Sequence, residues 1–488
     1  MSPALMNNCD FEDMISALQK ISQKAALTIR RQKSVMVVSH IDADGLASAG
    51  IACQSLSRLG IEYTPLFLKQ LDVRALNCIA DQGPDLVMFT DLGSGILDKI
   101  CGFDFDFVVA DHHRPAQFDA DDERGLVAHI NPHLVGADGA TSLSGSGASF
   151  LLASALAPYS QKSNDDLAAL ATVGAVGDLQ DMAQGRLVGM NRHILEIGVR
   201  RGVLASELDL KLFGKQTRPV FKMLEYSQDP FIPGLSGNED ACIAFLKDLG
   251  IRLGGERWRR WIDLNRDERS RVVSALMRKG LRAGISGNQI ERLIGEVYTL
   301  QDEVEGTELR DASEYSTLLN ATARYGYSDI GLRVCMGDRD SAFHEAQELL
   351  RRHRQNLVDG LKLVRDQGLT SLDHLQYFDA GDRIQDTIVG IVAGMCFYMA
   401  DRSKPILAFA RTENGGIKVS ARGTQNLVNS GLNLAKAISD AAVVVGGVGG
   451  GHNIASGATI PPGKKEEFLE LVNMTIGLQL SSTSLERS

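Results

Sequence analysis

The sequence predicts an α/β protein in which a parallel-sheet domain is followed by a helical insert and a smaller α/β domain. Between residues 34 and about 180, short β-branched runs alternate with stretches of helical periodicity, which is typical of βαβ units. Residues 186–335 show helical periodicity and many charges, and the β-branched runs return from residue 385. A chain of 488 residues has room for two or three domains with separate cores.

The first domain is expected over residues 34–185, after an N-terminal helix within residues 1–33. The first, third and fourth of its strands run directly into loops that carry acidic or histidine residues. Because ligands of open parallel sheets bind outside the carboxyl ends of the strands, these loops should converge on one crevice. The five strands are predicted at residues 35–39, 63–68, 86–90, 107–110 and 126–130.

The rest of the chain divides into three further regions and a tail. The helical insert covers residues 186–335, and a block of turn-forming residues at 229–237 marks a sharp loop inside it. Linker helices are expected at residues 336–384, including a long amphipathic helix at 341–367. The smaller α/β domain covers residues 385–475, with strands at 405–410 and 416–421, and residues 476–488 are expected to form a polar tail.

The composition is that of a folded soluble protein, with 44% hydrophobic residues, 23% charged residues and a mean hydropathy of -0.06. No apolar run approaches the roughly 20 residues that a membrane-spanning helix needs, and the N-terminus lacks a signal pattern, so we expect a cytoplasmic protein without membrane contact. The seven cysteines form no CxxC pair, which indicates neither a disulfide framework nor a zinc ribbon.

The net charge of -10 argues against broad binding to duplex nucleic acid, which relies on many basic side chains. Residues 252–282 are nevertheless rich in arginine. This segment forms either a local basic patch for a substrate or a solvated helical face.

The first chemical signal is the run Ser39-His40-Ile41-Asp42-Ala43-Asp44-Gly45, directly after an apolar strand. Alternate positions bring one imidazole and two carboxylates into a small volume, and glycine lets the backbone turn into the next helix. Standing alone, the run could equally reflect a helix cap by Asp44 beside an unrelated histidine.

The strongest signal is Asp111-His112-His113-Arg114, at the end of the fourth strand. Adjacent acid and imidazole groups are hard to explain as packing, because charged groups are rarely buried without a partner. Two single acids accompany it. Asp91 follows the third strand and Asp178 ends a predicted helical segment; each by itself would be a turn or surface residue.

Together these motifs supply enough nitrogen and oxygen donors for two divalent cations that share one carboxylate. Imidazole beside carboxylate favours Mn²⁺ over Mg²⁺, which prefers oxygen ligands. The six donors are His40, Asp42, Asp44, Asp91, His112 and Asp178.

The four motifs, in this order, resemble the DHH phosphoesterase superfamily, whose name describes Asp111-His112-His113. The resemblance implies one metal on His40, Asp42 and Asp91, and a second on Asp44, Asp91, His112 and Asp178, so Asp91 would be the bridge. It also implies that His113, beside Arg114, faces the substrate phosphate and that Asp111 orients a neighbouring histidine.

A second resemblance lies near the C-terminus. Residues 443–458 are predicted as a strand, a glycine loop and a helix start, an arrangement whose free N–H groups can bind phosphate. The GGGHNIASGA run within it is similar to the signature of the DHHA1 domain, and residues 420–423 resemble that domain's arginine-bearing strand. The substrate-binding residues that this implies are Arg422, Gly449, Gly450, Gly451, His452 and Asn453.

Motif order and length resemble the archaeal RecJ-like nucleases, which act with the replicative helicase and its GINS component. The resemblance implies a metal-dependent exonuclease of single-stranded DNA or RNA in DNA replication or repair, with two Mn²⁺ or Mg²⁺ ions in an interdomain cleft. The insert would bind the partner, so replacing residues 240–320 should spare cleavage.

Three other functions are weighed against this one. A short-oligonucleotide or cyclic-dinucleotide phosphodiesterase would share both domains, but the long insert disfavours it. A manganese pyrophosphatase resembles the first half, yet it spaces the first histidine differently and lacks the GGGH run. A non-catalytic replisome scaffold that binds GINS would be expected to have lost metal ligands, and here every ligand position is filled. Cleavage polarity and the choice of DNA or RNA stay open.

Overall fold

The structure is a computed structural model that describes residues 8–117, 124–157, 163–227, 231–255, 257–285, 287–412 and 414–485. It forms two compact units, Met1–Leu350 and Arg351–Ser488, which are described separately below. Among the described residues, no helix is both long enough and apolar enough to cross a membrane.

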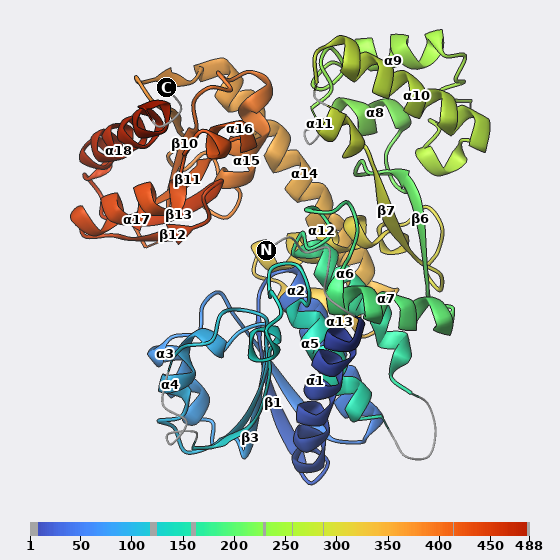
Figure 1. Cartoon of the computed structure of the whole chain (residues 1–488), viewed down its shortest axis with the longest axis vertical. Helices are drawn as coiled ribbons and strands as arrows, with labels where there is room; N and C mark the ends of the chain where they lie inside the picture. The colour runs from blue at the N-terminus through green and yellow to red at the C-terminus, as the bar shows by residue number, and fades with distance from the viewer. Residues whose placement is uncertain are drawn as a thin grey trace. The chain divides into compact units, whose positions relative to one another are not determined.

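The first unit is built on a parallel five-stranded sheet with the order β2-β1-β3-β4-β5. Figure 1 labels two of its strands, β1 and β3. All five strands predicted from the sequence are present, with ends that differ by at most one residue. They are β1 (Ser34–His40), β2 (Glu62–Leu68), β3 (Leu86–Thr90), β4 (Asp106–Ala110) and β5 (Leu126–Ile130).

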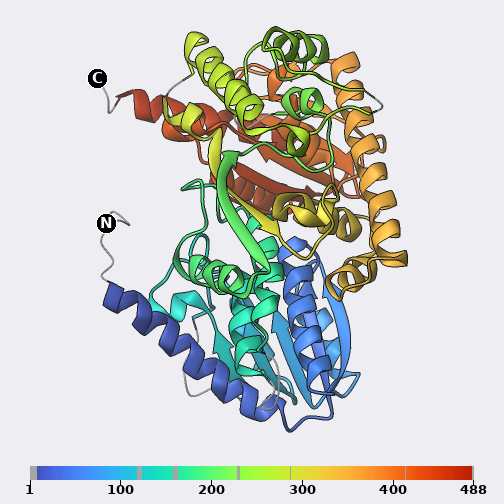
Figure 2. The same ribbon diagram turned by 90° about the vertical axis from the view of Figure 1, so that its right-hand side faces the viewer.

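Helices cover both faces of this sheet because alternate strand residues are apolar on each side. Val35 and Val37 pack in a core with α1 (Asn8–Ile29), α2 (Ala43–Arg58), α5 (Gly145–Ala155) and α6 (Ala168–Gly177). Met36 and Val38 face the other side, against α3 (Val73–Ala80) and α4 (Leu97–Ile100). In Figure 2, α1 and α2 lie in front of the sheet.

The insert differs from the purely helical expectation, because it contains an antiparallel two-stranded ribbon of β6 (Leu204–Leu210) and β7 (Ile294–Leu300). These strands are far apart in sequence, so the local pattern carried no sign of their pairing. The segment between them has a core of its own, and Figure 1 shows its helices gathered at one end of the ribbon. These helices are α8 (Val220–Glu225), α9 (Glu239–Asp248), α10 (Arg266–Arg282) and α11 (Gly287–Glu291).

The flanks of the insert belong to the sheet domain. The helices α7 (Gly189–Arg201), α12 (Ala312–Arg324) and α13 (Ser328–Cys335) contribute to the same core as α2 and α6. Within residues 186–335, therefore, one small subdomain between β6 and β7 is flanked on both sides by segments of the first domain. Of the expected turn block at 229–237, residues 229 and 230 lie outside the described residues.

The arginine-rich segment neutralises part of its own charge. Arg259 forms a bidentate salt bridge with Glu268, in which Nη1 and Nη2 lie 2.8 Å and 2.7 Å from the two carboxylate oxygens. Arg257 and Arg260 both form ion pairs with Asp263. These pairs favour the reading of a structured, solvated surface over that of an open basic patch.

Glu314 is a buried carboxyl group where α12 meets the segment before α8. It accepts hydrogen bonds from Gln216 N (2.7 Å) and Thr217 Oγ1 (2.5 Å). Burial and the neighbouring Asp311 carboxylate raise the pKa of Glu314 from an ordinary 4.5 to about 7. Between these pH values the folded protein keeps a proton that the unfolded chain has lost. The contribution of Glu314 to folding stability therefore falls as the pH rises from 4.5 to 7.

We expect Glu314→Gln to remove this loss. The amide can still accept from Gln216 N and donate to Thr217 Oγ1, but it carries no charge at any pH. At pH 8 the variant should be more stable than the wild type by on the order of 3 kcal/mol, and at pH 4 the two should be similar. Urea unfolding at both pH values measures this, with the exposed Glu305→Gln as control. An advantage that does not change with pH would contradict the assignment.

The second unit follows α14 (Ser341–Gln367), the long helix predicted from the sequence, which crosses the boundary between the units. Its six-stranded sheet has the order β12-β13-β11-β10-β9-β8. The strands are β8 (Thr370–Ser371), β9 (Gln376–Asp379), β10 (Ile406–Arg411), β11 (Ile417–Arg422), β12 (Val448–Gly451) and β13 (Ala455–Ile460). The helices are α15 (Val389–Met395), α16 (Gln425–Asn429), α17 (Leu434–Val444) and α18 (Lys465–Leu485).

Three expectations for this unit were wrong. Residues 336–384 are not only helical, since β8 and β9 already belong to the sheet. The expected polar tail is part of α18 as far as Leu485. The glycine run is not a loop between a strand and a helix: Val443 and Val444 end α17, and the glycines form the edge strand β12, which turns directly into β13.

Candidate metal centre

The last residue of β1, His40, and the loop after it, with Asp42, lie at the carboxyl edge of the sheet. Asp42, and not Asp44, caps α2: its Oδ1 accepts from Gly45 N at 2.9 Å. The other oxygen, Oδ2, lies 2.9 Å from His40 Nδ1. A Cβ at position 45 would collide with His40 O, so only glycine lets the chain turn this tightly into the helix.

Asp91 follows β3 with φ of 58°, a left-handed conformation that costs a non-glycine residue about 1–2 kcal/mol. Its N–H still bonds to Ala110 O (2.9 Å) in the neighbouring strand, so the strained turn carries the side chain into the edge of the sheet. The side chain is only 2% exposed. A Cβ on Gly145, at the start of α5, would collide with the Asp91 carboxylate.

Asp44 is held by the N-terminus of α5. Gly145 N donates to its Oδ2 (2.7 Å) and Ser146 N to its Oδ1 (3.0 Å), and the helix dipole favours the negative charge. Gly174 of α6 leaves room for the same carboxylate. The sequence reasoning missed both glycines; the only signal was the run of small residues around each.

His112 is oriented by its main-chain surroundings. Its Nδ1–H donates to Gly139 O (2.8 Å), so the Nε2 lone pair faces Asp91 Oδ1 (3.3 Å) and Asp178 Oδ2 (3.8 Å). Gln180, also missed from the sequence, donates to Asp178 Oδ2 and to Gly139 O, both at 2.9 Å. Burial and the Asp44 carboxylate raise the pKa of Asp178 to about 6.

The structure therefore brings all six predicted donors to one edge of the sheet. Among the described residues, three groups of side chains offer ligand atoms that lie within 4.8 Å of one another. These groups are His40, Asp42 and Asp91; Asp44, His112 and Asp178; and Asp91, Asp111, His112 and His113.

Two buried atoms of this cluster are placed as metal ligands would be. Within the described part of the chain, Asp91 Oδ1 is buried without a hydrogen-bond partner, and the buried His40 Nδ1 faces two carboxylate oxygens, Asp42 Oδ2 at 2.9 Å and Asp91 Oδ2 at 3.8 Å. Burial and the surrounding carboxylates, first that of Asp44, raise the pKa of Asp91 well above its ordinary value. A divalent cation would satisfy the lone pairs of these atoms and the crowded negative charge, so the donor set fits a divalent-cation site.

Asp111 has a different environment from the other acids. It is fully buried; Oδ1 accepts from His113 Nδ1 (2.8 Å) and Oδ2 accepts from Ser94 N (3.0 Å). Burial raises its pKa, but the bond from His113 outweighs this and holds the pKa below the usual range. These partners suit a residue that orients His113, whose ring is 57% exposed, and the neighbouring Arg114 is exposed as well.

The predicted nucleotide-binding residues gather at one end of the second unit's sheet. Arg422 ends β11 opposite Ala455, and His452 and Asn453 form the exposed turn between β12 and β13. Gly423 N bonds to Ile454 O (2.8 Å), which ties this turn to the end of β11. Their position in a cleft with the metal donors stays a prediction.

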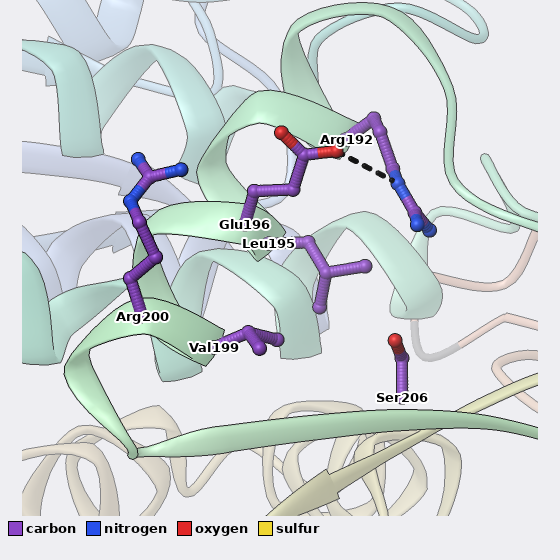
Figure 3. A pocket seen from close by; sticks show the side chains of 6 residues that line it. All are labelled: Arg192, Leu195, Glu196, Val199, Arg200 and Ser206. Carbon is purple, nitrogen blue, oxygen red and sulfur yellow. Dashed lines mark hydrogen bonds and ion pairs between the residues drawn. The ribbon is translucent and has the colours of Figure 1, made fainter.

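A pocket between α7 and β6 is lined by none of the candidate metal donors (Figure 3). Arg192 bonds to Glu196 (3.3 Å), one turn along α7, and to Glu296 of β7 (2.6 Å). Arg192 and both of these glutamates are thus already engaged in ion pairs with one another. We therefore assign the pocket no part in the candidate metal centre. Its lining is Arg192, Leu195, Glu196, Val199, Arg200 and Ser206.

Three family models match the chain in series. The N-terminal domain of the DHH family matches residues 34–177, the DHH-CID domain residues 212–294 and the DHHA1 domain residues 373–478. An uncharacterized protein of Methanocaldococcus jannaschii is 30% identical over 451 residues, which cover 91% of this chain and 94% of that protein. The single-stranded-DNA-specific exonuclease RecJ of Bacillus subtilis is 26% identical over 42% of this chain and 26% of its own length.

Solved structures share the fold over nearly the whole chain. Exonuclease RecJ bound to manganese has a TM-score of 0.57 and 16% identity, with 94% of each chain covered. CDC45 from Entamoeba histolytica has a TM-score of 0.61 and 10% identity, with 97% of this chain and 99% of that chain covered. With its family-model matches, its motifs and this likeness, the chain belongs to the DHH family, as a RecJ-like member with a DHHA1 domain.

Proposed function

We propose that the protein is a metal-dependent exonuclease of single-stranded nucleic acid that acts in the cytoplasm, in DNA replication or repair. The observation that carries this proposal is the convergence of the six donors, among them Asp91, whose buried Oδ1 has no hydrogen-bond partner among the described residues. The choice of substrate is supported by the Bacillus subtilis relative, whose name describes it as specific for single-stranded DNA.

In this proposal each site holds two Mn²⁺ or Mg²⁺ ions. Such a pair stabilises the charge that develops on the attacking and leaving oxygens of a phosphodiester. Imidazole among the donors favours Mn²⁺. One ion would be bound by His40, Asp42 and Asp91, and the other by Asp44, Asp91, His112 and Asp178.

The chain's own residues prepare this site in advance. The α5 N-terminus fixes Asp44, Gln180 fixes Asp178, and Gly139 O fixes the His112 ring, so little reorganisation is needed during the reaction. His113 and Arg114 would face the scissile phosphate. The neighbouring nucleotide would be bound by Arg422, Gly449, Gly450, Gly451, His452 and Asn453.

Product analysis tests the proposal directly. Purified full-length protein is incubated with single-stranded DNA and RNA labelled at either end, with Mn²⁺, Mg²⁺ or excess chelator. We expect stepwise release of nucleotides that requires one of the two ions, and the labelled products give the polarity. Turnover by a clean preparation in excess chelator would contradict the two-metal site. Activity confined to dinucleotides or cyclic dinucleotides would favour the short-oligonucleotide phosphodiesterase instead.

A non-catalytic replisome scaffold is the second candidate, favoured by the fold shared with CDC45. Against it, all six donors are present and converge, which a protein without metal chemistry has no reason to keep. The same assay separates the two functions: no turnover with either ion on any strand would support the scaffold.

The subdomain between β6 and β7 is our proposed surface for a GINS partner. A replacement of residues 240–320 would damage the first domain, because it removes β7 and core residues of α12. The structure shows where the subdomain can be removed without cutting the ribbon. Lys211 N bonds to Leu293 O (2.8 Å) beside the last pair of the ribbon, Leu210 and Ile294. The chain thus leaves and re-enters the ribbon at adjacent points.

We expect that replacing residues 212–292 with an Asn-Gly turn leaves a plain β6–β7 hairpin and a folded metal domain. Binding of purified GINS should be lost, while cleavage of short single strands stays within a few-fold of wild type. Calorimetry or pull-down measures the binding, and the end-label assay measures cleavage. Retained binding with lost cleavage would assign the subdomain to chemistry instead.

A further inference from the structure

Side chains from the loops after β3, β4 and β5 form a closed circuit of hydrogen bonds next to the metal donors. Ser94 N donates to Asp111 Oδ2 (3.0 Å), and Asn131 Nδ2 donates to Ser94 Oγ (2.9 Å). Asn131 Nδ2 also donates to His113 O (2.8 Å), and His113 Nδ1 donates to Asp111 Oδ1 (2.8 Å), which closes the circuit. No sequence motif had singled out Ser94 or Asn131.

The circuit holds His113 at three points. Its main-chain N–H (3.2 Å) and its ring Nδ1 (2.8 Å) both donate to Asp111 Oδ1, and its carbonyl accepts from Asn131. With Nδ1 engaged, Nε2 is the ring atom left for a ligand, on a side chain that is 57% exposed. The direction in which Nε2 points is therefore set by Asp111 on one side and Asn131 on the other.

Asn131 uses every polar atom of its side chain. Its Oδ1 accepts from His133 N (2.9 Å), its Nδ2 serves Ser94 and His113, and the residue is fully buried. The Ser94 hydroxyl, which accepts from Nδ2, also shares a hydrogen bond with His129 Nε2 (2.9 Å). Fully satisfied buried networks of this kind favour a single arrangement.

We propose that Asn131, acting with Ser94, is a positioning residue that holds His113 in the orientation in which its Nε2 meets the substrate phosphate. The inference rests on the proposed phosphodiesterase function. Asn131 is a more specific probe than Asp111, because Asp111 also accepts from the N–H of the candidate metal donor His112 (2.7 Å), whereas the side-chain hydrogen bonds of Asn131 to Ser94, His113 and His133 reach none of the six donors.

The test uses Asn131→Asp, which keeps the shape and the acceptor for His133 N but replaces both donor hydrogen bonds by an oxygen. Asn164→Asp is the matched control: Asn164 is fully buried in the same unit and donates to Ala153 O (2.6 Å), away from the metal donors. We expect Asn131→Asp to lower kcat about ten- to a hundredfold, with KM and the Mn²⁺ dissociation constant changed less than about threefold. The control should keep wild-type kcat.

Ser94→Ala adds a double-mutant cycle. In the wild-type background it should lower kcat by about two- to tenfold, and in the Asn131→Asp background it should cause little further loss, because both act through one circuit. Independent, additive losses would overturn the shared role. If Asn131→Asp lowered the Mn²⁺ affinity and kcat by the same factor, Asn131 would instead support the metal site as a whole. If activity fell only in proportion to the folded fraction, the role of Asn131 would be general structural stability.

A spectroscopic measurement separates this inference from the proposed function. In protein with ¹⁵N-labelled histidine, the ring signals of His113 are assigned as those that disappear in a His113→Ala variant. These signals should shift or broaden in Asn131→Asp and stay unchanged in Asn164→Asp. If the wild type hydrolyses no phosphodiester, the proposed function fails, yet this measurement still reports whether the circuit holds His113. Unchanged His113 signals in Asn131→Asp would overturn the inference.

Discussion

Asp91→Asn should lower phosphodiester hydrolysis by more than about a thousandfold while the protein stays folded. Asparagine keeps the side-chain shape and adopts the left-handed backbone at position 91 more readily than most residues. It removes the one carboxylate that both cations would share, and each loss of about 1.4 kcal/mol in transition-state stabilisation lowers the rate tenfold. The end-label assay with Mn²⁺ measures the loss, and the exposed Asp85→Asn should behave as wild type.

The same variant has a thermal signature. Without a divalent ion, the variant avoids the cost of burying an ionisable Asp91 carboxyl group beside other carboxylates, first that of Asp44, so the metal-free protein should melt a few degrees higher than wild type. With saturating Mn²⁺ the order should reverse, because the wild type gains more from binding. A variant that melts lower under both conditions would indicate a structural role for Asp91. Full Mn²⁺-dependent turnover in a folded variant would reject the bridging assignment.

Gly450→Ala should impair hydrolysis of oligonucleotides without damaging the fold. Of the three glycines in β12, Gly451 has φ of 142° and a Cβ there would crowd Ser456 Cα at 2.7 Å, whereas a Cβ at Gly450 meets nothing within 4 Å. The fold therefore does not need glycine at 450, and an effect of the added methyl group would come from a ligand that approaches the backbone. We expect KM to rise or kcat to fall about ten- to a thousandfold on oligonucleotides.

His452→Ala should give a loss in the same range, since its exposed imidazole would donate to a nucleotide phosphate. A small activated phosphodiester that reaches only the metals should be hydrolysed at nearly wild-type rates by both variants. Gly451→Ala is the structural control, and it should lower the melting temperature whatever the substrate. Equal losses on large and small substrates by Gly450→Ala, with unchanged melting, would contradict a nucleotide-binding role.

The strands of the first sheet and the chemistry at its edge could be predicted from the sequence because both depend on local pattern. β-branched runs and the alternation with helical segments located β1 to β5, and parallel strands necessarily end at a common edge. His40, Asp91 and His112 each follow such a strand, so their meeting followed from topology. The long helix α14 was equally readable, since its apolar repeat persists over 27 residues.

Other features depended on partners distant in sequence. Val443 and Val444 favour a strand locally, but α17 continues through them because Leu434, Ile438 and Ala442 pack on the second unit's sheet and leave both valines exposed. The pairing of β6 with β7 is likewise made across the whole inserted subdomain.

The sequence by itself therefore predicted the candidate metal donors and the sheet edge at which they meet. Only the tertiary structure decided what holds the site residues in place: Gly145 lies against Asp91, Gln180 bonds to Asp178, and Asn131 bonds to the carbonyl of His113, which is not one of the six donors. The physical reason is that residue type and spacing act over a few neighbours along the chain, whereas a buried hydrogen bond or a close backbone approach requires a second segment whose position is set only when the whole core packs.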